Sequence, residues 1–335
     1  MRSTTPVAQP SAPGSATAPR TGWRRLLSIP TPLIFSASVA IAVILLWRQG
    51  TLSNLASTAG DVDASRLSAI ALLYLGGLSL LCLRWHLLIR MAGGVSDVPR
   101  AAEAFLTSVV INYAAPIGLA IPTRALLSSR DLGLTATASG AVAVWEVALD
   151  ALVLGGIGIA WLVFGEQIAN SPFQANPVLL VAAGFVAGVG LLGAATLAWR
   201  RPRHRLRFQV AAIEMARYPI HHPGLALGAM ISSLVYWGVQ GMTLALLLDA
   251  AGIERSITIG LILGLLGFPV LIGMFSPVPG GAGVREALMV AVAQASGIDG
   301  AAVLLAAVAY RVALFAAIPP LYLVARGWRA LRRDD

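Results

Sequence analysis

A stretch of eleven residues, Ser276 to Glu286 (SPVPGGAGVRE), places two prolines, three glycines and an Arg-Glu pair between long apolar runs. Proline removes a backbone donor and glycine weakens a helix, so this stretch predicts a break between two helices. Irregular backbone at membrane depth is tolerated only where it is buried in protein or lines a polar cavity. The stretch therefore predicts a polar site inside a membrane protein and favours transport over simple anchoring.

The composition is typical of a polytopic membrane protein, because 57% of the 335 residues are hydrophobic and only 12% are charged. All 24 basic residues are arginines, and the formal net charge is +9. Since these arginines flank apolar runs, we interpret them as topology signals rather than as a nucleic-acid surface. With one cysteine, Cys82, and four histidines, we expect no metal site and no cofactor.

Apolar runs of sufficient length predict an all-α protein with about six full transmembrane helices. These runs are Thr31–Trp47, Arg66–Leu88, Ala136–Phe164, Asn176–Trp199, Gly224–Leu248 and Gly300–Val324. Residues 1–28, rich in Ser, Thr, Pro and Ala, predict a disordered cytoplasmic tail. For the run Thr31–Trp47, a cleaved signal peptide is the weaker alternative to a first transmembrane helix. Residues 29–335 then form a single integral membrane domain.

Two further apolar segments are too interrupted to be plain spanning helices. Ala101–Arg130 contains Asn112, Pro116, Gly118 and Pro122, and Ser256–Ser296 contains Pro269, Pro277, Pro279 and several glycines. We predict two re-entrant helical hairpins, the first entering from the cytoplasm and the second from outside. A crossing by Ser256–Ser276 alone is the alternative for the second segment.

The predicted order of span, hairpin and span occurs twice, in residues 66–164 and again in residues 224–326. The two halves have opposite orientations, which predicts an inverted-topology repeat of the kind found in many transporters. Most arginines then fall on one side of the membrane. By the positive-inside rule, both termini are expected in the cytoplasm, at a bacterial cytoplasmic (inner) membrane.

Six ionisable residues fall within the predicted membrane zone, where each costs about 2.5–3.5 kcal/mol unless it is paired or hydrated. They are Arg124, Glu146, Asp150, Arg285, Glu286 and Arg311. Glu146 and Asp150 are four residues apart and share one helix face, so they form either a structural ion pair or a cation, proton or counter-charge site. Arg311 is either a buried partner of Glu146, Asp150 or Glu286, or a direct ligand of a lipid phosphate.

The glycines Gly280, Gly281 and Gly283 permit tight backbone at the predicted start of a half-helix near Val284. Backbone N–H groups at such a helix start can approach an anion. The alternative is a tight turn between helices with no ligand.

With these motifs, the chain resembles the flippase-like transmembrane region of the lysyl-phosphatidylglycerol synthase family over roughly residues 66–326. The resemblance is carried by Pro279–Glu286 and Tyr310-Arg311, and in the first half by Asn112, Pro116, Arg124, Glu146 and Asp150. Ala120-Ile121 and Val147 depart from it, since the family tends to have Gly-Glu and Arg there. One acid and one base are thus missing together, which leaves the net charge of the site unchanged.

The resemblance implies lipid translocation without lipid synthesis, because the chain stops soon after Arg326 and carries no cytosolic synthase domain. We therefore expect a lipid flippase or transporter and not an enzyme. Arg285 and Arg311 would contact the phosphate, and Glu146, Asp150 and Glu286 would balance them or hold a cationic headgroup. Asn112, Arg124 and the three glycines complete the expected substrate-binding set.

The expected ligand is a membrane lipid: an anionic or aminoacylated phospholipid, a glycolipid or an isoprenoid-type lipid. Protein partners could be a second copy of the chain or an envelope-synthesis enzyme. Two alternatives stay open, a non-transporting partner of an envelope lipid or glycan synthesis complex and a membrane-embedded lipid transferase. The second needs clustered carboxylates for Mg²⁺, and only Asp61 and Asp63 form a close pair outside the predicted spans.

Overall fold

The computed structural model describes Leu33, Ser36 and residues 63–95, 97–114, 117–164, 217–253, 257–276 and 281–331. The predicted tail, nearly all of the first predicted span and the whole of the span Asn176–Trp199 lie outside these residues. The described part of the chain is helical and contains no strand. This confirms the predicted all-α membrane protein.

Four helices in the described part are long and apolar enough to cross a membrane. They are α4 (Ala64–Met91), α7 (Ala136–Phe164), α11 (Pro223–Ala250) and α14 (Gly300–Leu331). Each corresponds to one predicted span, and the ends differ mainly in α4 and α14, which continue beyond the predicted Leu88 and Val324. α11 has its proline in the first turn, where a missing N–H costs no hydrogen bond.

Four shorter helices form the two predicted hairpins. They are α5 (Val98–Ala114) and α6 (Ile117–Leu132) in the first, and α12 (Ile259–Phe275) and α13 (Val284–Ala295) in the second. The hydroxyl of Thr258 caps α12 by accepting the N–H of Leu261. With 17 residues, α12 is about 25 Å long and short of the ~30 Å hydrocarbon core, and it packs back on α13. That the two hairpins are re-entrant, and the side of the membrane from which each enters, stay predictions.

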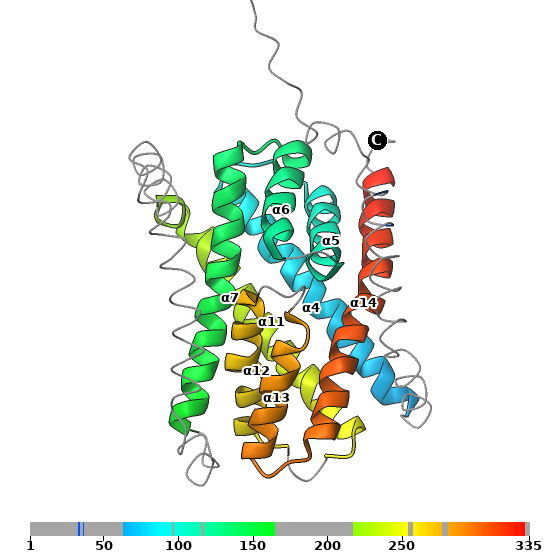
Figure 1. The fold of residues 1–335 in the computed structure, drawn as a ribbon. Coiled ribbons are helices and arrows are strands. Elements are labelled where there is room, and N and C mark those ends of the chain that lie inside the picture. The colour runs from blue at the N-terminus through cyan, green and yellow to red at the C-terminus, as the bar shows by residue number, and fades with distance from the viewer. Residues whose placement is uncertain are drawn as a thin grey trace, which may run out of the picture.

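The packing of these helices follows a two-fold pattern. Each hairpin packs one arm on its own half and the other arm on the opposite half. The long helices α4 and α11 pack along each other. The second arm of each hairpin packs on the last long helix of its own half, α6 on α7 and α13 on α14. The first arm packs on the last long helix of the other half, α5 on α14 and α12 on α7. In Figure 1 the α5–α6 hairpin lies at one end of the molecule and the α12–α13 hairpin at the other, as an inverted repeat requires.

Glycine allows α12 to approach α7 very closely. A Cβ atom built on Gly267 would lie 2.6 Å from Cα of Gly158 and 2.7 Å from its backbone nitrogen. One turn away, a Cβ on Gly264 would meet the indole of Trp161 at 2.7 Å. Small residues allow such backbone approach between helices in membranes, so these glycines fix how the second hairpin lies on the other half.

We predict that Gly267→Ala destabilises the protein by about 1–3 kcal/mol, because the added methyl group must push α12 away from α7. The matched control is Gly156→Ala, which lies on the exposed face of α7 with no atom within 4 Å of an added Cβ. That control is expected to be neutral or slightly stabilising, since alanine favours helix more than glycine does. Thermal unfolding in detergent measures both, and equal melting temperatures for the two variants would contradict the close contact.

Candidate functional site

A cavity of about 280 Å³ lies where the two hairpins meet the long helices. Each of the eight helices named above contributes to its wall, so the cavity is a product of the whole fold. Apolar side chains and aromatic rings form most of the wall. Five charged residues also line it: Arg84, Arg124, Glu146, Asp150 and Arg285.

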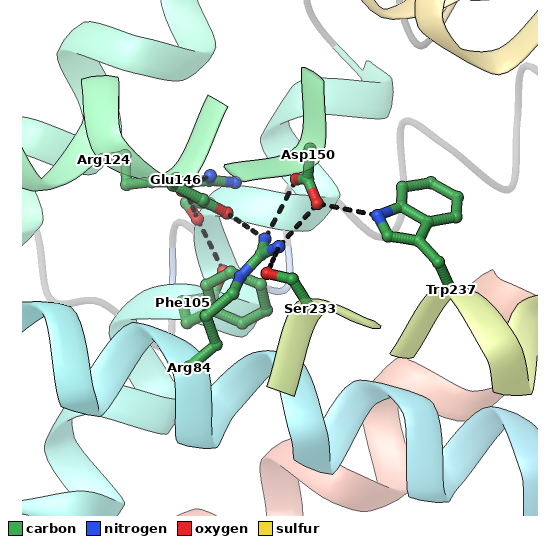
Figure 2. A network of polar contacts seen from close by, with 8 residues as sticks. Arg84, Phe105, Arg124, Glu146, Asp150, Ser233 and Trp237 are labelled. Carbon is green, nitrogen blue, oxygen red and sulfur yellow. Dashed lines mark hydrogen bonds and ion pairs between the residues drawn. The ribbon is translucent and has the colours of Figure 1, made fainter. Parts of the chain in front are cut away.

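The first charged cluster centres on Arg84 of α4, which is only 1% exposed. Its guanidinium donates to Asp150 with two N–O distances of 2.5 and 3.0 Å, and it lies 3.4 Å from Glu146. It also donates to the hydroxyl of Ser233 at 3.0 Å. Trp237 donates its indole N–H to Asp150 at 3.0 Å, so α4, α7 and α11 meet at this point (Figure 2).

Arg124 extends the cluster to α6. Its guanidinium pairs with the second oxygen of Glu146, and its Nε donates to Ser108 at 2.8 Å. The same guanidinium lies over the ring of Phe105 at 5.2 Å and over that of Trp85 at 5.5 Å. Aromatic faces stabilise a cation in this way, which helps to hold the charge of Arg124 at the cavity wall.

The second charged cluster joins α13 to α14. Arg311 donates to Glu286 at 2.6 Å, and the other oxygen of Glu286 accepts the backbone N–H of Gly283 at 2.7 Å. Arg285 approaches Glu286 at 3.8 Å and lies over the ring of Tyr310 at 5.0 Å. Arg311 therefore points toward the protein and pairs with one of the three predicted partners.

The backbone before α13 requires glycine at two positions. Gly281 and Gly283 have φ angles of +67° and +81°, a region that favours glycine. A Cβ on Gly281 would also lie 2.5 Å from the carbonyl oxygen of Gly273. α13 begins at Val284, where the sequence predicts a half-helix. The positive end of this helix is occupied by the carboxylate of Glu286, which accepts the N–H of Gly283.

Five of the ten predicted site residues line the cavity: Arg124, Glu146, Asp150, Gly281 and Arg285. Glu286 joins Arg311 and Gly283 to this wall through its contact with Arg285. Arg124, Glu146 and Asp150 belong to the first cluster, and Arg285, Glu286 and Arg311 to the second, with Gly281 and Gly283 beside it. Gly280 lies outside the described residues, as does the side chain of Asn112, whose backbone is in α5.

Arg84 is the residue that sequence reasoning missed. It lies four residues before Leu88, the predicted end of the second span, and is absent from the six ionisable residues predicted for the membrane zone. In the structure α4 continues to Met91, so Arg84 lies two turns inside the helix. The sequence did contain a signal for such a residue, because two carboxylates on one face of a membrane helix need a guanidinium at the same depth. That signal does not identify which arginine supplies the guanidinium.

A model of the lysylphosphatidylglycerol synthase TM region matches residues 34–320. The chain belongs to this family. A search of curated proteins and a search of solved structures each found no match. Membership of the lysylphosphatidylglycerol synthase TM family, together with the apolar helices, makes this a multi-pass membrane protein with a role connected to membrane lipids.

We predict that Arg84→Met destabilises the protein by about 3–5 kcal/mol, because it removes a buried partner of Glu146 and Asp150. Arg66→Met is the control, since Arg66 is 42% exposed and pairs with Asp249 at a helix end, where ion pairs contribute about 0–1 kcal/mol. Adding Asp150→Asn to Arg84→Met should recover part of the loss, because it removes one unbalanced carboxylate. Melting temperatures in detergent test this, and a neutral Arg84→Met would show that the cluster does not stabilise the fold.

Proposed function

We propose that this member of the lysylphosphatidylglycerol synthase TM family is a lipid transporter of the bacterial cytoplasmic membrane. The lipid headgroup would enter the central cavity while its acyl chains stay in the bilayer. The observation that carries this proposal is a cavity with charged residues in its wall, to which four helices long and apolar enough to cross a membrane contribute. Intramembrane charges of this kind are expensive and mark substrate or ion pathways.

The size of the cavity supports a headgroup as the transported part. Ligand pockets for small molecules measure about 300–1,000 Å³, and this cavity of about 280 Å³ lies at the lower end. A small phosphate headgroup fits this volume, whereas a complete lipid with two acyl chains does not. The chains would therefore remain in contact with the membrane during transport.

The two-fold packing supports alternating access as the transport mechanism. The hairpins of the two halves both line the cavity, and each has one arm on its own half and one on the other half. Tilting one half against the other would therefore change the cavity walls at both ends. In transporters with inverted repeats, such rocking exposes a central site to one side of the membrane at a time.

In this proposal Arg285 contacts the headgroup phosphate, and Arg311 and Glu286 hold α13 in place. The chain carries out no catalytic step. Both termini lie in the cytoplasm, and the hairpins are re-entrant. The direction of transport is set by the lipid gradient, by a coupled ion or by a partner, since the sequence contains no GxxxxGK[ST] motif for ATP.

We predict that Val147→Trp slows lipid transport at least about tenfold, because Val147 lines the cavity and a large ring would fill it. The control is Val144→Trp on the same helix, where the side chain is 49% exposed on the outer surface. The measurement is dithionite bleaching of fluorescent, acyl-labelled phospholipids in vesicles that contain the purified protein. Size-exclusion profiles and melting temperatures establish that both variants fold.

Equal transport by the two variants would place the pathway elsewhere. If the wild-type protein moves none of the phospholipids supplied, the transport proposal is wrong, and a non-transporting partner of a lipid-synthesis complex becomes the better reading.

A further inference from the structure

The charges around the cavity do not cancel. In the first cluster, Arg84 and Arg124 balance Glu146 and Asp150. In the second cluster, the guanidinium groups of Arg285 and Arg311 both contact the carboxylate of Glu286. Among the described residues of the two clusters, four positive groups thus accompany three negative ones, a surplus of one positive charge. Residues 115–116 and 277–280, which connect the arms of the two hairpins and lie outside the described residues, contain no ionisable side chain in the sequence.

A surplus charge at this depth favours a ligand that neutralises it. Ions are strongly disfavoured in a low-dielectric interior unless an opposite charge lies close by. A ligand with one net negative charge makes the occupied cavity neutral. A zwitterionic headgroup leaves the surplus in place, and a headgroup with a net positive charge increases it. The electrostatic cost therefore ranks ligands by their net charge.

The surplus lies in the cluster that contains Arg285, whose side chain is 5% exposed and lines the cavity. Its guanidinium stacks on Tyr310. Stacking uses the face of a guanidinium, whereas a phosphate binds its edge, so both contacts can be made together.

We infer that the cavity selects lipid headgroups with a net charge of −1, a phosphodiester whose substituent is uncharged, and that Arg285 determines this selection. The inference concerns binding and rests on the proposed function only for the lipid nature of the ligand. Acyl chains distinguish such a lipid from a soluble phosphodiester with the same charge. The apolar helices around the cavity favour the lipid.

The test is competitive lipid binding to the full chain in detergent, read by native mass spectrometry, which identifies each bound lipid by its mass. The probes share acyl chains and differ in headgroup charge: phosphatidylglycerol (−1), phosphatidylethanolamine (zwitterionic) and lysyl-phosphatidylglycerol (net positive). We expect phosphatidylglycerol to bind about 10- to 100-fold more tightly than the other two, the usual effect of a charge-assisted contact. Glycerophosphoglycerol, the same diester without chains, should compete only weakly.

In Arg285→Gln the two clusters carry three positive and three negative described groups. We therefore expect this variant to lose the preference for phosphatidylglycerol. Arg285→Lys keeps the charge and should retain the order of the three lipids at lower affinity. The matched control is Arg66→Gln, which removes a partly exposed arginine in the first turn of α4 and should leave the order unchanged.

Three results would overturn the inference: equal binding of all three lipids to the wild type, tighter binding of lysyl-phosphatidylglycerol, or an unchanged order in Arg285→Gln. The first two need no variant, so the test stands even if Arg285→Gln fails to fold. Competition by glycerophosphoglycerol as strong as that by the lipid would overturn the lipid assignment. Selective binding without movement in vesicles would uphold this inference and overturn transport. Equal movement of every lipid across the vesicle membrane, with equal binding of every headgroup, would overturn this inference and uphold transport.

Discussion

The buried guanidinium of Arg84 is the constraint on which the first half of the structure depends. A charge that is 1% exposed inside an apolar bundle requires opposite charge at contact distance, and Glu146 and Asp150 on one face of α7 supply it. Through Ser233 and Trp237 the same cluster includes α11. Through the pairing of Glu146 with Arg124 it also includes α6, so four helices are held at a single point of the cavity wall.

The second half contains a corresponding ion pair in which the hairpin arm carries the acid and the long helix carries the base. In each half one ion pair joins the second arm of the hairpin to the last long helix, Arg124 to Glu146 and Glu286 to Arg311. Arg311 lies eleven residues after the start of α14, and Val147 lies eleven residues after the start of α7. At the same distance from the start of the last long helix, the second half therefore has an arginine where the first half has a valine.

The helices were predictable because their signals are local, whereas the partners of the charges were not. Apolar length and the proline and glycine breaks indicated four long helices and two hairpins in the described part, and α13 begins at the expected Val284. The sequence left three candidate partners for Arg311, and only the packing of α13 on α14 selects Glu286. Arg84 escaped prediction for the same reason, since its depth depends on where α4 ends and its partners lie on another helix.

The contacts of the two clusters divide the cavity wall into two internally connected groups. The ion pairs of the first cluster connect α4, α6 and α7, and those of the second connect α13 and α14. Arg84, Arg124 and Arg285 all line the cavity that lies between them. An anion that contacts both groups gains its full binding energy only when α7 and α14 lie at the right separation. Because a ligand shifts a conformational equilibrium only by its difference in affinity for the two states, this geometry is what would allow a bound headgroup to favour one arrangement of the two halves over another.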